Sequence, residues 1–107
     1  MKTVRTHVRR KLPVEVFYDK NHMPLIDFSF GGVGVNFKEV APPEQDNIRL
    51  TLIFPYQGKN VGWEVNAKVV RVDHKTKFAA FEFIEDDDFQ KFTLAFYDEM
   101  RSRGMMK

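Results

Sequence analysis

The 107 residues of this chain suffice for one domain with its own core, and eleven phenylalanines among 30% charged residues predict a compact aromatic core rather than disorder. The absence of cysteine excludes a disulfide framework and thiolate metal sites, and it fits a cytoplasmic protein. No apolar run reaches the roughly 20 residues of a membrane span, and residues 1–5 lack the apolar core of a signal peptide, so we expect a cytoplasmic chain without membrane insertion.

The net charge of +2 is unevenly distributed. Residues 1–11 hold five bases and no acid, whereas residues 12–107 hold twelve bases and fifteen acids. A basic arm of +5 on a body of −3 suits a local anionic ligand better than a long polyanion, because nucleic-acid binders usually spread Lys and Arg across one face. A solvated, flexible tail is the alternative that these charges leave open.

Alternating apolar and polar side chains predict six strands, at residues 12–18, 25–30, 33–37, 48–54, 61–72 and 78–84. The polar turn at 19–22 predicts that the first two strands pair antiparallel. Apolar side chains move from odd to even positions near Val69, which indicates a bulge or a change of burial. The last strand is apolar on both faces except at Glu82, as expected of a strand lying between the barrel core and a helix.

A helix is predicted over residues 86–103. Acidic residues 85–88 cap its start and Gly104 closes its end, while apolar side chains recur at helical spacing: Phe89, Phe92, Phe96 and Met100. We therefore predict a single all-β domain over residues 1–107, a six-stranded antiparallel β-barrel with a C-terminal α-helix. Within it, residues 1–11 are expected to be a flexible basic arm and residues 12–84 the barrel.

The second predicted strand has two unlike faces. Alternation places Ile26, Phe28 and Phe30 on a buried face, and Asp27 and Ser29 on a polar face. A tight turn or bulge is expected directly afterwards, at Gly31 and Gly32. The third strand is nearly bare on its outward side, so we expect a flat patch beside the polar face.

Arginine and aspartate side chains on these segments suit a guanine ligand. Arg5 and Arg9 are four residues apart, and a guanidinium can grip guanine O6 and N7, clamp a phosphate or stack on a base. An ionised Asp27 only accepts hydrogen bonds, which matches the donors on the N1 and N2 edge of guanine. The alternative is that Asp27 and Ser29 merely satisfy backbone groups of the turn.

Two motifs together resemble the PilZ domain family. Residues 5–9, RTHVR, match its RxxxR element, and residues 27–32, DFSFGG, match its [D/N]xSxxG element. The resemblance implies a six-stranded barrel that binds the bacterial second messenger cyclic di-GMP. The loop with the RxxxR element would wrap the ligand onto the strand at 25–30, which carries the second element. It implies guanine or phosphate contacts for Arg5 and Arg9, guanine or backbone contacts for Asp27 and Ser29, and close approach at Gly32.

Two further residues complete the predicted site. Arg10 is expected to add a phosphate contact, and Trp63 is either core or a base-stacking aromatic. The predicted cyclic di-GMP site therefore comprises Arg5, Arg9, Arg10, Asp27, Ser29, Gly31, Gly32 and Trp63. We expect no cofactor and no metal, because the three histidines are scattered, and no enzyme activity, because no nucleophile constellation or phosphate loop is present.

We accordingly predict a cyclic di-GMP receptor module in which ligand orders the arginine arm and so regulates a protein partner or an attached domain, in motility, biofilm or exopolysaccharide control; DNA binding is not expected. One alternative is a barrel that binds single-stranded nucleic acid, although Phe28, Phe30 and Phe37 are expected to face the core rather than the surface. Another is a PilZ-type interaction module that no longer binds ligand. The sequence does not define the oligomeric state.

Overall fold

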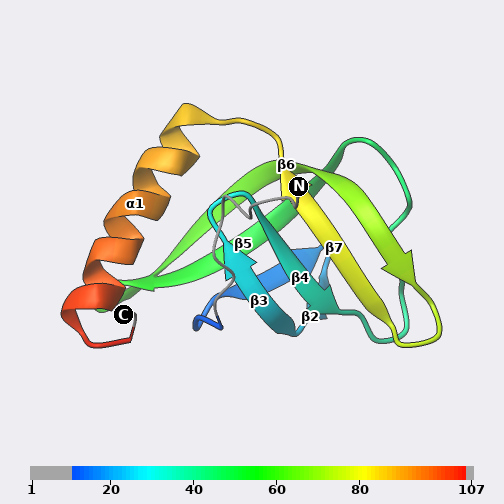
Figure 1. The fold of residues 1–107 in the computed structure, drawn as a ribbon, viewed down its shortest axis with the longest axis horizontal. Coiled ribbons are helices and arrows are strands. Elements are labelled where there is room, and N and C mark those ends of the chain that lie inside the picture. Colours follow the sequence, from blue (N-terminus) through cyan, green and yellow to red (C-terminus); the bar gives the residue numbers. More distant parts are fainter. Residues whose placement is uncertain (1–10, 106–107) are drawn as a thin grey trace, which may run out of the picture.

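A computed structural model gives the fold of residues 11–105, a nearly closed antiparallel barrel followed by one helix (Figure 1). The predicted all-β barrel with a C-terminal helix is confirmed. The strands follow the order β2-β1-β5-β6-β7-β4-β3 around the sheet. The elements are β1 (Glu15–Tyr18), β2 (Asn21–Met23), β3 (Leu25–Ser29), β4 (Gly32–Asn36), β5 (Ile48–Tyr56), β6 (Lys59–Asp73), β7 (Phe78–Phe83) and α1 (Asp87–Ser102).

The barrel has seven strands rather than the predicted six, and one predicted pairing is wrong. Residues 21–23 belong to a strand, β2, and β2 pairs with β1 in place of the predicted strand at 25–30. The turn between them shrinks to two residues because Asp19 adopts a left-handed φ of 56°, which aspartate tolerates better than most residues. Pro24, which lacks a backbone N–H, separates β2 from β3, and β3 pairs with β4 instead.

A bulge in β3 changes which side chains face the core. Leu25 lies opposite Val35 and Asp27 lies opposite Gly34, so Ile26 is the extra residue. Leu25 consequently packs against the buried cluster, in the place predicted for Ile26. Asp27 points outward as predicted, because the alternation resumes after the bulge.

The predicted bulge near Val69 is confirmed in β6. Val69 lies opposite Phe81 and Arg71 opposite Ala80, which leaves Val70 as the extra residue, with 58% of its surface exposed. Because directly opposed residues share a face of the sheet, the bulge turns Arg71 to the outside of the barrel.

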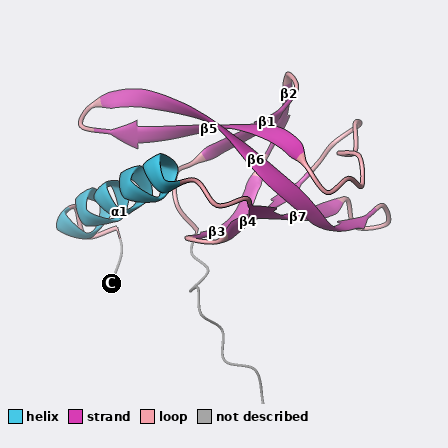
Figure 2. Ribbon diagram, turned by 90° about the horizontal axis from the view of Figure 1, so that it is seen from above, coloured by secondary structure: helices cyan, strands magenta, loops and turns pink. Residues whose placement is uncertain are grey.

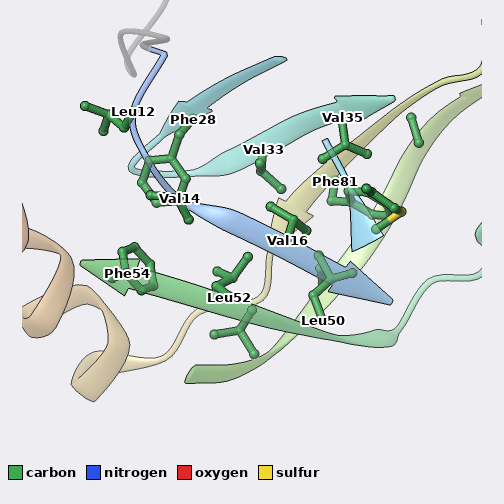
Figure 3. Close-up of a cluster of buried hydrophobic side chains, with 14 of the residues drawn as sticks. Leu12, Val14, Val16, Phe28, Val33, Val35, Leu50, Leu52, Phe54 and Phe81 are labelled. Carbon is green, nitrogen blue, oxygen red and sulfur yellow. The ribbon is translucent and has the colours of Figure 1, made fainter. Parts of the chain in front are cut away.

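The barrel interior is filled by the inward residues of β5 and of the strands around it. Along β5, every second residue from Ile48 to Phe54 is buried, as period-two alternation requires. Figure 3 shows these side chains meeting those of β1, β3, β4 and β7. The labelled members of this core are Leu12, Val14, Val16, Phe28, Val33, Val35, Leu50, Leu52, Phe54 and Phe81.

Helix α1 lies at one end of the barrel beside β5 (Figure 2). Its start is capped by Asp86, whose Oδ1 accepts from the Phe89 N–H at 3.0 Å, and Phe89, Phe96 and Met100 are buried. The prediction that the helix covers the outer face of β7 is wrong at Phe78, which lies under Arg71 of β6, whereas Phe89 of the helix meets Phe83 at the other end of the strand, 5.2 Å between ring centroids. Within residues 11–105, no helix is long and apolar enough to span a membrane.

Truncation of Phe54 should uncouple the helix from the barrel. The fully buried Phe54 ring lies 5.0 Å from the rings of both Phe92 and Phe96. We expect Phe54→Ala to lower the free energy of unfolding by about 3–5 kcal/mol, the range for a large aromatic side chain removed from a core. Urea denaturation measures this, with Leu94→Ala as control because Leu94 is 55% exposed on the same helix. Equal losses in the two variants would contradict this role of Phe54.

Candidate ligand-binding site

Ser29 closes the turn that joins β3 to β4. Its Oγ accepts from the Gly32 N–H at 3.1 Å and donates to the Gly32 carbonyl oxygen at 3.2 Å. Only 2% of its surface is exposed. The hydroxyl therefore satisfies backbone groups of the turn, as the alternative interpretation of this residue supposed.

The two glycines of the turn are held against β7. The Gly31 carbonyl accepts from the Phe83 N–H at 2.9 Å, and a Cβ added to Gly32 would collide with the carbonyl oxygen of Phe81. The close approach that Gly32 permits in this structure is therefore an approach of the neighbouring strand. Glycine is needed here because β4 and β7 come too close for any side chain at this position.

The Asp27 carboxylate lies on the outside of the barrel, over Gly34. A Cβ added to Gly34 would come within 2.9 Å of Asp27 Oδ1 and within 3.4 Å of Phe78 Cε1. The flat patch predicted beside Asp27 is thus covered by the Asp27 carboxylate and the edge of the Phe78 ring, and Gly34 itself is buried. Because residue 34 has no Cβ, there is room above it for the Asp27 carboxylate.

Strand register extends this outer surface to β6. Asp27 lies opposite Gly34, Gly34 opposite Ala80, and Ala80 opposite Arg71. Residues in direct register share one face. These four residues therefore form a row across the sheet, with an acid at one end, a base at the other and two small residues between them. Arg71 was missed by the sequence reasoning, which located the bulge before it but could not tell which face the following residue would occupy.

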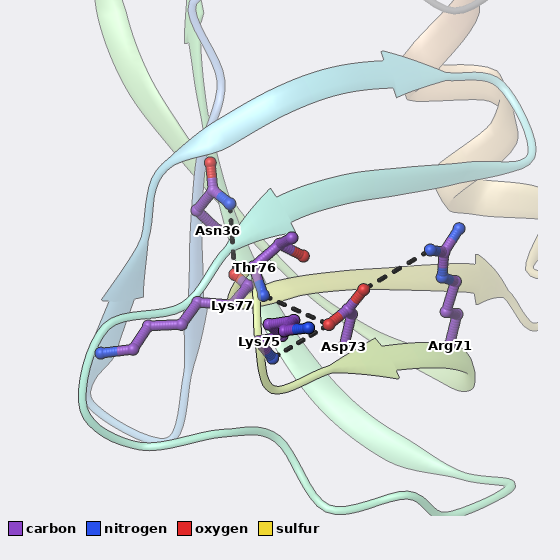
Figure 4. A network of polar contacts seen from close by, with 6 residues as sticks. All are labelled: Asn36, Arg71, Asp73, Lys75, Thr76 and Lys77. Atoms are coloured by element: carbon purple, nitrogen blue, oxygen red, sulfur yellow. Dashed lines mark hydrogen bonds and ion pairs between the residues drawn. The ribbon is translucent and has the colours of Figure 1, made fainter.

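Arg71 also belongs to a polar network at the end of β6 (Figure 4). Its Nη2 lies 3.6 Å from Asp73 Oδ2, while Asp73 Oδ1 accepts from the backbone N–H groups of Lys75 at 2.9 Å and Thr76 at 3.2 Å. The Thr76 and Lys75 N–H groups, with a smaller effect of the Arg71 charge, lower the pKa of the Asp73 carboxyl below its ordinary value. Asp73 thus closes the turn and lies beside the arginine.

A hollow of about 230 Å³ lies between the motif turn and the start of α1. Phe30 and Gly31 form one wall, and three acids contribute to its lining: Glu82, Glu85 and Asp86. Because these carboxylates repel phosphate, an anionic ligand on the Asp27 surface would be directed away from the hollow.

The predicted site residues fall into three groups. Asp27, Ser29, Gly31 and Gly32 lie together at the β3–β4 hairpin. Trp63 lies elsewhere, with its ring 5.7 Å from Phe89 and 5.3 Å from Phe92, and so packs between β6 and α1. The remaining three, Arg5, Arg9 and Arg10, lie outside the described residues.

The alternative of a nucleic-acid barrel requires exposed aromatic side chains on adjacent strands. Phe28 and Phe37 are 0% and 5% exposed, and Phe30 is half-buried in the turn. These three rings therefore form no exposed stacking surface. Between residues 11 and 105, no group of three or more His, Asp or Glu side chains is arranged to hold a metal ion.

The family model of the PilZ domain matches residues 1–97, so the chain belongs to the PilZ domain family. That match covers both motifs, the whole barrel and most of α1. A comparison with curated protein sequences finds no match.

Two solved structures share the fold. An uncharacterized Legionella protein, Lpg0364, aligns with a TM-score of 0.68 and 16% identity, over 94% of this chain and 99% of that chain. The Bacillus subtilis inhibitor of motility MotI/DgrA aligns with a TM-score of 0.70 and 21% identity, over 99% of this chain. The chain spans only 55% of the MotI/DgrA chain, so that protein contains a further part with no counterpart in the alignment.

Adding a methyl group at Gly32 should destabilise the barrel even without ligand. Its Cβ would meet backbone of β7, which cannot move without disrupting the strand pairing. We expect Gly32→Ala to lower the free energy of unfolding by about 1–3 kcal/mol. Gly62→Ala is the matched control, because a Cβ there meets only the end of the Ile53 side chain at 3.4 Å. Identical melting temperatures for wild type and Gly32→Ala would contradict this packing role.

The contribution of Asp73 to stability should depend on pH. Because its pKa is lowered by folding, the ionised carboxylate stabilises the fold above its unfolded pKa of about 3.9, and this contribution disappears as pH falls through the lower folded pKa. Thermal unfolding of wild type and Asp73→Ala should therefore differ at neutral pH and converge in strong acid. Asp73→Asn, which keeps an acceptor for the turn, should fall between them. A difference that is the same at all pH values would refute this assignment.

Proposed function

We propose that this chain is a cyclic di-GMP receptor module rather than an enzyme, with the β3–β4 hairpin as the fixed half of the site and the segment containing Arg5 and Arg9 as the other half. The proposal is supported most by Asp27, whose carboxylate lies on the outside of the barrel directly after the bulge at Ile26. Membership of the PilZ family and the intact RxxxR and [D/N]xSxxG elements support the same assignment.

The chemistry of the hairpin favours a guanine edge over a phosphate. An ionised carboxylate repels phosphate but accepts hydrogen bonds from the N1 and N2 donors of guanine, which adenine lacks. Ser29 and Gly32 contribute by fixing the turn that follows Asp27, since both hydrogen bonds of the serine hydroxyl stay within the hairpin.

The arm supplies the positive charge that the hairpin lacks. Residues 1–11 carry five bases and no acid, so their arginines can neutralise the phosphates of a dinucleotide whose guanine faces Asp27. Ordering such a segment costs conformational entropy, so several groups must engage the ligand at once. The arm then takes a different position in the bound state, and a partner or attached domain that contacts the arm responds to the ligand.

Removal of either motif arginine should weaken cyclic di-GMP binding. Loss of a charged hydrogen bond costs about 1.5–3 kcal/mol, so we expect Arg5→Ala and Arg9→Ala each to raise the Kd by roughly 10- to 150-fold. Isothermal titration calorimetry measures the change. Lys2→Ala is the control, because it removes the same charge from the arm outside the RxxxR element.

The choice of ligands separates the alternatives. We expect cyclic di-GMP to bind, and GTP and cyclic di-AMP to bind weakly or not at all, because only the first offers both the guanine edge and the second base. Absence of cyclic di-GMP binding by the wild-type chain would favour an interaction module without ligand. A salt-dependent gel shift with oligonucleotides that cyclic di-GMP does not compete would favour nucleic-acid binding.

A further inference from the structure

The outer face of the barrel next to Asp27 also carries a contact between two side chains, Arg71 and Phe78. The Arg71 Cζ atom lies 5.5 Å from the centroid of the Phe78 ring, within the range of a cation–π contact. The edge of the same ring reaches the space above Gly34, where the Asp27 carboxylate lies. A continuous strip therefore runs from the carboxylate through the aromatic ring to the guanidinium.

Two bulges aim the ends of this strip outward. The extra residue in β3 is Ile26, directly before Asp27, and the extra residue in β6 is Val70, directly before Arg71. Bulges often re-aim a side chain beside a functional site. Between the ends, neither Gly34 nor Ala80 has a side chain larger than a methyl group, and the edge of the Phe78 ring takes the space that this leaves above Gly34.

Arg71 is held in place but remains open on one side. The Phe78 ring supports it and the Asp73 carboxylate lies 3.6 Å from its Nη2, yet 67% of the arginine side chain is exposed. The carboxylate offsets its positive charge, which makes Arg71 a poor phosphate clamp. A guanidinium plane supported by an aromatic ring instead offers its free face for stacking.

The spacing fits a ligand with two bases. Neighbouring strands lie about 4.8 Å apart, so the backbones at Asp27 and Arg71, separated by three strand spacings, lie roughly 14 Å apart along the sheet, and the Phe78 ring lies between the two side-chain ends. A base whose edge meets Asp27 is separated from Arg71 by the Phe78 ring, whereas the two guanines of a cyclic dinucleotide can occupy both places.

We propose that Arg71 and Phe78 form a stacking shelf for the second guanine of a cyclic dinucleotide whose first guanine is read by Asp27. This inference rests on the proposed function and adds the residues that favour a two-base ligand over a mononucleotide. The shelf does not select guanine over adenine, because every base has a face on which a guanidinium can stack.

The experiment compares a two-base ligand with a one-base ligand. Arg71→Ala should raise the Kd for cyclic di-GMP by roughly 3- to 30-fold, the loss expected for one cation–π stacking contact. Its affinity for GMP, followed by NMR titration, should stay within about twofold of wild type, because the single base of GMP needs only the Asp27 surface. Arg71→Lys should not restore binding, since lysine keeps the charge but lacks the plane.

Arg49→Ala is the matched control. Arg49 is likewise an exposed arginine on a strand, 3.0 Å from its ion-pair partner Glu64, but it lies on β5. Thermal melts of all variants check that each is folded. Phe78→Leu, which keeps an apolar side chain but removes the ring, should weaken cyclic di-GMP binding as Arg71→Ala should.

The outcomes separate this inference from the proposed function. If cyclic di-GMP binds to wild type and is lost in Arg5→Ala while Arg71→Ala binds like wild type, the shelf is refuted and the receptor function stands. Full rescue by Arg71→Lys refutes stacking in favour of a charge contact. If cyclic di-GMP does not bind to the wild-type chain at all, both proposals are overturned.

Discussion

The placement of both β3 and the helix depends on the contacts of the Phe54 ring. Its edge-to-face contact with Phe28 of β3 spans 5.8 Å, and on its other side it meets Phe92 and Phe96 of α1 at 5.0 Å. Each such pair adds about 0.5–1.5 kcal/mol beyond the burial of its surface. Barrel and helix are thus joined by one aromatic cluster, and the strand that presents Asp27 rests on the same cluster.

The outer surface depends on β4, which has almost no side chains facing outward. Gly32 lets β7 approach and Gly34 leaves room for the Asp27 carboxylate, while Val33 and Val35 on the same strand are fully buried in the core. A strand that is full on one side and bare on the other lets side chains of its two neighbours reach across its bare side. The acid of β3 and the aromatic ring of β7 therefore meet above it.

Local patterns predicted much of this structure, because alternation and capping act within a few residues. The inward residues of β5, the bulge after Val69 and the helix following Asp86 were all readable from residue order. The strand that pairs with β3 could not be read from residue order, because the alternation is the same whichever strand lies alongside. The two-residue turn after Tyr18 depends on the left-handed backbone of Asp19. The proximity of Asp27, Phe78 and Arg71 could not be predicted from residue order either, since it depends on the register across four strands.

The hydrogen bonds between Ser29 and Gly32 change what the [D/N]xSxxG element tells us about this chain. Two of its three fixed letters are needed by the hairpin itself, whether or not a ligand is present. A variant of this chain that bound no ligand would still need the serine and the glycine to keep the hairpin. The first letter of the element, together with the two arginines of the arm, is where such a loss would be visible.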